Sequence, residues 1–105
     1  MRIETYGDQL EVTPALSEYV ETKLRRLEKH FDQHCEVRVT LALRKPDHHV
    51  KADVNVPGQA LHADASGQTM YAAIDVLADK LDRLVIKHKE KKQQHAPQSV
   101  RDNIV

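Results

Sequence analysis

Apolar side chains change their spacing several times along this chain, and each change marks the boundary of an expected element. Apolar residues three or four positions apart between residues 16 and 31 predict one face of an amphipathic helix. Thr13 and Pro14 directly precede this segment and are suited to the cap and the first position of a helix. The same spacing returns further along the chain and predicts a second helix over roughly residues 69–92.

Between the two helices the period falls to two residues, which is typical of strands that bury one face. Residues 36–44 (EVRVTLALR) alternate from Val37 to Leu43, with the apolar side chains on one side. Residues 50–56 (VKADVNV) alternate in the same way, and a Pro-Gly turn follows them. Residues 59–66 (QALHADAS) then predict a weaker third member of the same meander.

The predicted order is β-α-β-β-β-α, because the first residues, MRIETY, alternate loosely enough to form a short first strand. A strand joined to the next by a crossover helix favours a parallel, right-handed pair. The apolar faces of the later strands need a cover, which two amphipathic helices supply. We therefore expect an α+β domain over residues 1–92, with two roughly parallel helices on one face of a four-stranded mixed sheet. Residues 93–105 lack periodicity and contain Pro97, which predicts a flexible C-terminal tail.

Composition narrows the possible functions. The chain has 105 residues, enough for one small domain, and its 16 basic and 16 acidic side chains cancel. An electrostatic function must therefore come from how the charges are arranged in space. No segment is apolar enough for a membrane span or resembles a signal peptide, and the single cysteine, Cys35, cannot form an internal disulfide, so we expect a cytoplasmic protein. The scarcity of aromatic residues argues against reading unpaired bases by stacking.

Charged residues on both expected helices are sorted by sign when they are placed at 100° intervals. Each helix carries basic side chains along the same flank of its apolar stripe, and acidic ones on the opposite flank. The basic rows are Lys80, Arg83, Lys87 and Lys91 on the second helix, and Lys23, Arg26 and His30 on the first, with Lys29 further round. The acidic residues are Asp75, Asp79, Asp82 and Glu90 on the second helix, and Glu18, Glu21 and Glu28 on the first.

A helix with rows of like charge lacks the pairs of opposite charge, three or four residues apart, that would each stabilise it by about 0.2–0.5 kcal/mol. A helical turn rises about 5.4 Å, so such a row presents cations at intervals comparable to successive phosphates of a nucleic-acid strand. The pattern favours a surface for RNA phosphates without base reading, with the acids on the far flank repelling the polyanion and orienting it. Periodicity alone leaves a merely solvated charged face as an equal alternative.

Two segments of the chain resemble a known family. EVTPALSEYVETKLRRLEKHF and SGQTMYAAIDVLADKLDRLVIKHKEK are similar to the short form of bacterial ribosome hibernation promoting factor and its sibling, the ribosome-associated inhibitor A. The resemblance runs from the first strand to about Lys92, and its most specific part begins at Met70. It implies a fold similar to a double-stranded-RNA-binding domain and a factor that silences translation in stationary phase or stress.

The resemblance also implies a partner and a set of contacts. The factor would bind ribosomal RNA of the small ribosomal subunit, compete there with mRNA and tRNA, and be a monomer when free. Carried over position by position, the implied RNA contacts are Lys23, Arg26, Lys29, Lys80, Arg83 and Lys87, extended by Lys89, Lys91 and Lys92. The tail is longer than that of the promoting factor and lacks the acidic end of its sibling. The body of the chain favours the promoting factor, and the tail leaves open whether ribosome dimers are favoured or opposed.

Other groups of residues give weaker indications of function. His30, His34 and Cys35 could share a metal, but no further ligand is indicated, so we expect neither a metal nor another cofactor. The chain has no glycine-rich phosphate loop, and Asp75 and Asp79 belong to an exposed helical row rather than a cleft, so we expect no enzyme. No membrane partner is indicated. The alternatives are a small domain that pairs with itself through its charged flanks, and a generic binder of double-stranded RNA.

Overall fold

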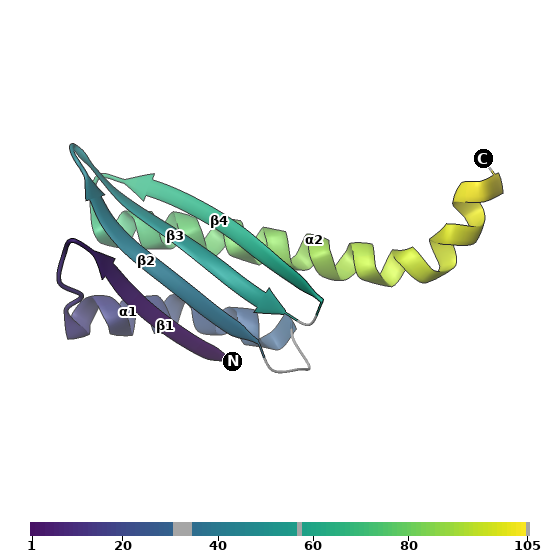
Figure 1. The fold of residues 1–105 in the computed structure, drawn as a ribbon, viewed down its shortest axis with the longest axis horizontal. Coiled ribbons are helices and arrows are strands. Elements are labelled where there is room, and N and C mark those ends of the chain that lie inside the picture. The colour runs from purple at the N-terminus through teal and green to yellow at the C-terminus, as the bar shows by residue number, and fades with distance from the viewer. Residues whose placement is uncertain (31–34, 57, 105) are drawn as a thin grey trace.

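The computed structural model describes residues 1–30, 35–56 and 58–104, with side chains described as far as Lys89. The elements are β1 (Arg2–Asp8), α1 (Pro14–Leu24), the 3-10 helix η1 (Arg25–His30), β2 (Glu36–Arg44), β3 (Asp47–Val56), β4 (Gln59–Gly67) and α2 (Met70–Ile104). Figure 1 shows them in two layers, a sheet and a pair of helices that run side by side in the same direction. The predicted order β-α-β-β-β-α is therefore confirmed.

The sheet follows the order of the chain, β1-β2-β3-β4. β1 pairs parallel with β2, because the chain crosses over through α1, and the other two pairs are antiparallel hairpins. α1 packs on β1, α2 packs on β3 and β4, and the two helices contact each other. Both helices cover one face of the sheet (Figure 1), which confirms the predicted mixed α+β fold.

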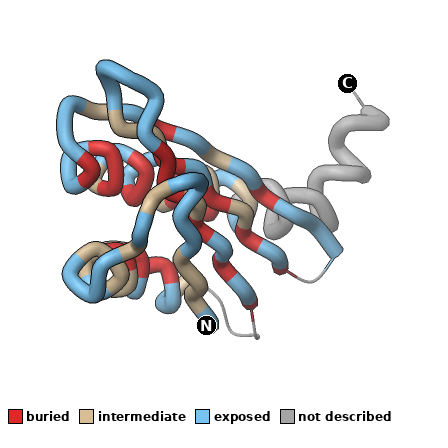
Figure 2. Tube along the Cα trace, turned by 60° about the vertical axis from the view of Figure 1, so that its left-hand side comes forward, coloured by how far each residue is buried: buried red, intermediate tan, exposed pale blue. Residues whose placement is uncertain are grey.

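The core lies between the sheet and the helices, and buried residues recur along the strands and on one side of each helix (Figure 2). The buried residues on β2 and β3 that follow the predicted alternation are Val37, Val39, Leu41, Val50, Ala52, Val54 and Val56, and Ala42 on β2 is buried in addition. Leu43 is an exception to the prediction, since 45% of it is exposed. It pairs with His48 next to the β2–β3 turn, at the end of the hairpin where side chains have fewer neighbours.

Helix starts agree with the capping residues of the sequence. The Thr13 hydroxyl accepts a hydrogen bond from the Leu16 amide at 3.2 Å, and Thr69 does the same for the Ala72 amide at 3.0 Å. Gly67 brings β4 close to α2, because a Cβ there would lie 2.9 Å from the backbone nitrogen of Ala73.

Two helix ends differ from the sequence prediction. The first helix tightens into η1 after Leu24, a common way for a terminal turn to satisfy its carbonyls, and this turn buries Leu27. α2 continues to Ile104 rather than ending near residue 92, because residues such as Gln and Ala propagate an established helix, and it also includes Pro97 at the cost of one backbone hydrogen bond. The separation of a tail at residue 93 stays a prediction.

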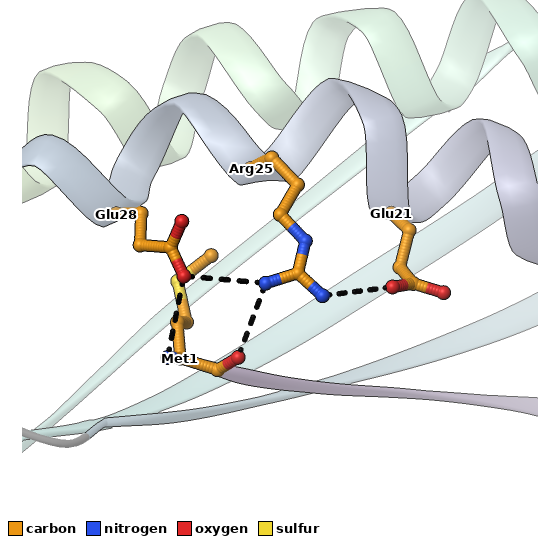
Figure 3. A network of polar contacts seen from close by, with 4 residues as sticks. All are labelled: Met1, Glu21, Arg25 and Glu28. Atoms are coloured by element: carbon orange, nitrogen blue, oxygen red, sulfur yellow. Dashed lines mark hydrogen bonds and ion pairs between the residues drawn. The ribbon is translucent and has the colours of Figure 1, made fainter.

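The start of β1 is tied to the first helix by ion pairs, as Figure 3 shows. The amino group of Met1 lies 3.4 Å from a Glu28 carboxylate oxygen, and Arg25 donates to the same oxygen at 3.2 Å. Arg25 also donates to Glu21 at 2.9 Å and to the Met1 carbonyl oxygen at 3.3 Å. Two of the three acidic residues on the acidic flank of the first helix, Glu21 and Glu28, thus have internal partners at the β1 edge.

Within the described part of the chain, no helix combines the length and apolar character that crossing a membrane requires.

Candidate nucleic-acid interface

Complementary rows of charge line the contact between the first helix and α2. We call these three pairs the interhelix ladder: Lys23 Nζ to Asp75 Oδ1 at 3.4 Å, Arg26 Nη2 to Asp79 Oδ1 at 2.7 Å, and His30 Nε2 to Asp82 Oδ1 at 3.1 Å. The first two pairs are half exposed on both sides, whereas the His30 and Asp82 side chains are 13% and 29% exposed. The ladder therefore has two accessible pairs and one partly buried pair.

The ladder corrects the prediction that the acidic row of α2 forms a far flank and stands away from the basic residues. Because the helices are parallel neighbours and both carry basic residues on the same flank, the basic flank of one meets the acidic flank of the other. Asp75 and Asp79 therefore act as partners of Lys23 and Arg26 in the free protein.

Tyr19, which the sequence analysis did not select, completes the first pair of the ladder. Its hydroxyl donates to Asp75 Oδ1 at 2.6 Å, and the Lys23 ammonium lies 5.4 Å from the centre of its ring. The hydrogen bond to the Asp75 carboxylate raises the pKa of the Tyr19 hydroxyl, with desolvation as a further cause. Tyr71 packs edge-on against the Tyr19 ring with 4.8 Å between centroids. In the sequence, Tyr19 lies four residues before Lys23, and this spacing, which places both side chains on one side of the helix, is the signal that indicates their contact.

Arg26 dominates the electrostatics of the second pair. Its hydrogen bond lowers the pKa of the Asp79 carboxyl, and the charges of Arg26, Arg83 and Lys23 add to the effect. Asp79 therefore stays ionised well below neutral pH. Arg83 contributes from the solvent side of α2, so Asp79 lies among cations that come from both helices.

The basic residues on the other side of α2 form what we call the outer row: Lys80, Arg83 and Lys87, all exposed. Lys80 Nζ donates to the Asp64 carbonyl oxygen of β4 at 2.9 Å, which places this end of the row beside the edge of the sheet. None of the described carboxylates forms an ion pair with a member of the outer row. The cations of such a row can donate hydrogen bonds to phosphate oxygens without first releasing an acidic partner.

Two further candidate residues are exposed but do not belong to the outer row. Lys29 on η1 and Lys89 on α2 are exposed and, among the described side chains, form no ion pair either. The side chains of Lys91 and Lys92 lie outside the described residues. The structure thus divides the candidate residues into cations already paired with aspartates, Lys23 and Arg26, and cations without such partners in the described region.

The opposite face of the sheet carries a different pattern. Its exposed residues alternate in sign across the strands, as in the row that pairs Glu4 with Arg38 and Arg38 with Asp53. Arg2 donates to Glu4 at 2.9 Å, and His62 contacts Asp53. Because the signs are mixed and the acids are paired, this face offers no row of cations for a phosphate backbone.

The described residues give little support for a metal site or for a reactive thiol. No group of three His, Cys, Asp or Glu side chains in the described residues could hold a metal ion. His34, one of the ligands considered from the sequence, lies outside those residues. Burial raises the pKa of the Cys35 thiol, which keeps it in the poorly nucleophilic protonated form.

Comparisons with known proteins agree on one family. A family model described as sigma 54 modulation protein / S30EA ribosomal protein matches residues 3–93. A ribosome hibernation promoting factor from Azotobacter vinelandii is 50% identical over 91 residues, which cover 87% of this chain and 85% of that protein. The factor of the same name from Escherichia coli K12 is 45% identical over 95 residues, which cover 90% of this chain and all of that protein (100%).

Solved structures show the same similarity. The N-terminal domain of Thermus thermophilus Protein Y has a TM-score of 0.78 and 32% identity, and the match covers 84% of this chain and 99% of that one. A ribosomal subunit interface protein from Coxiella burnetii has a TM-score of 0.76 and 31% identity, covering 87% of this chain and 100% of that one. None of these names refers to an enzyme.

Proposed function

The chain belongs to the sigma 54 modulation protein / S30EA ribosomal protein family, and from this premise we propose that it is a ribosome hibernation factor. In this proposal it acts in the cytoplasm, binds ribosomal RNA of the small subunit and occupies the channel that mRNA and tRNA would use. Translation stops because the channel is filled, so the protein needs neither a catalytic group nor a cofactor.

The outer row is the observation that carries the proposal. Lys80, Arg83 and Lys87 lie on successive turns of α2, so that about 10 Å of helix separates the first from the last at about 1.5 Å per residue. Each contact with a phosphate releases condensed counterions, which makes binding favourable at low salt without any base-specific contact. The anchoring of Lys80 on β4 reduces the freedom of that side chain and so lowers the entropic cost of presenting it.

The ladder weakens the alternative of a domain that pairs with itself. Such pairing would need the acidic row of α2 to meet a basic row of a second copy. Asp75 and Asp79 already have partners within the same chain, on the first helix. The proposal therefore takes the free protein as a monomer and the ribosome as its partner.

The proposed function is tested by co-sedimentation of the purified protein with small ribosomal subunits through a sucrose gradient. We expect co-migration with empty subunits at moderate salt, and loss of co-migration when mRNA and tRNA are bound beforehand. Co-migration that mRNA and tRNA leave unchanged would place the protein elsewhere on the subunit. Absence of co-migration with empty subunits would refute the proposal itself.

A further inference from the structure

We propose that Asp75 and Asp79 are internal counter-ions that compete with RNA phosphate for Lys23 and Arg26 and thereby limit the affinity of the first helix for RNA. This inference rests on the proposed function, since it assumes that the helical face meets RNA. It assigns a role to two acidic residues that neither the sequence pattern nor the family resemblance includes in the binding surface.

The geometry of the ladder supports an exchange of partners. Arg26 donates to Asp79 at 2.7 Å, yet its side chain is 40% exposed and that of Asp79 is 63% exposed. Pairs this exposed are held weakly, so a phosphate can reach the guanidinium and replace the carboxylate without unpacking the helices. The first pair is similar, because Lys23 and Asp75 are 42% and 48% exposed.

The third pair of the ladder stays in place during such an exchange. His30 and Asp82 are much less exposed than the other two pairs and link η1 to α2 near the buried Leu27. The helices are also held together by the Tyr19–Asp75 hydrogen bond and by the packing of Tyr19 on Tyr71. Release of Arg26 from Asp79 is therefore a local change of side chains rather than a movement of helices.

Because of the competing carboxylates, Lys23 and Arg26 bind a polyanion less readily than the cations of the outer row do. A polyanion that meets only the outer row finds cations without described acidic partners, whereas one that meets the first helix must first displace Asp75 and Asp79. A displaced carboxylate also remains close to the incoming phosphate, and like charges at short range oppose binding. An RNA therefore adds the first helix to its contacts only where the phosphates gained there outweigh the displaced carboxylates, which disfavours extended binding by scattered RNA in the cell.

The test measures binding to a short RNA duplex of arbitrary sequence by fluorescence anisotropy at fixed salt. We expect Asp79→Asn to raise the affinity about threefold and the double variant Asp75→Asn/Asp79→Asn about tenfold, as expected for surface ion pairs. The salt dependence should also steepen by about 0.7–0.9 for each cation that is released to a phosphate. Asn keeps the shape of Asp and can still accept the Tyr19 hydrogen bond, and unchanged thermal melting would verify that each variant is folded.

Two controls separate partner exchange from a general effect of charge. Glu36→Gln removes one negative charge from the open face of the sheet, so it should leave the affinity unchanged. In an Arg26→Ala background, Asp79→Asn should produce a clearly smaller gain, since the hydrogen-bonded guanidinium is gone and only the weaker charge interactions of Asp79 with Arg83 and Lys23 are removed. If Asp79→Asn raised the affinity no more than Glu36→Gln does, or raised it by the same factor with and without Arg26, the inference would be overturned.

The same comparison applies to the first pair of the ladder, where the effect of Asp75→Asn is measured with Lys23 present and in a Lys23→Ala background. Because all these measurements use an RNA duplex rather than ribosomes, their outcome is independent of whether wild-type protein co-sediments with small subunits.

Discussion

Neutralising two members of the outer row provides a quantitative test of phosphate binding. Lys29, Lys80, Arg83, Lys87 and Lys89 are exposed and form no described ion pair, so between three and five of them can meet phosphates. At about 0.7–0.9 per phosphate, the logarithm of affinity should fall with the logarithm of salt concentration with a slope of about 2–5. Arg83→Gln with Lys87→Gln should lower this slope by about 1.4–1.8, because two contacts are removed.

Lys80 is left in place because its hydrogen bond to the Asp64 carbonyl gives it a structural role as well. The matched control is Lys45→Gln with Lys51→Gln, which removes the same charge from the β2–β3 turn and the open face of the sheet. The assay is binding of labelled protein to small ribosomal subunits over a salt series at constant Mg²⁺. A wild-type slope below about 1, or equal slopes for the outer-row variant and the wild type, would refute backbone binding through this row.

Two further predictions concern stability. Tyr19→Phe removes the hydrogen bond to Asp75 and should lower the Tm in thermal unfolding followed by circular dichroism. Because the pKa of Tyr19 is raised in the folded state, its contribution is present below pH 10 and is lost as the pH rises through the folded value, so the difference between Tyr19→Phe and the wild type should shrink at high pH. Leu81→Ala removes a fully buried side chain of α2 and should cost about 2–5 kcal/mol in urea unfolding, whereas a cost below 1 kcal/mol would mean that α2 does not pack on the sheet as described.

The fold was predictable because each element has its own period of apolar residues. The alternation around Val50 and Val54 and the helical spacing around Ile74 and Leu81 select the residues that are buried. The crossover between the first two strands then left one arrangement that satisfies the handedness rule. Details that depend on neighbours in space were not predictable in this way, and these include the exposure of Leu43 at a hairpin end and the 3-10 turn that follows α1.

The interhelix ladder depends on a contact between two helices that the pattern of either helix alone does not contain. The helical spacing places basic residues on the same flank of both helices, and the order of the elements predicts that the helices are parallel. Those two statements together require the basic flank of one neighbour to face the acidic flank of the other. The step that was missing is the lateral contact between the helices, which brings Arg26 to Asp79 although they are far apart in the chain.

The pairing of acids also explains how a chain without net charge can present a cationic surface. Its 16 acidic residues balance its 16 basic ones in number but not in position. Glu21 and Glu28 are occupied by Arg25 and the amino terminus, and the aspartates of the ladder are occupied by the first helix. Because these acids have other partners, the outer row forms no ion pair with a described carboxylate. Distant RNA meanwhile meets a molecule with little net attraction. In the proposed function, binding then depends on close fit to the helical face, which is the property that a factor directed to one site on the ribosome requires.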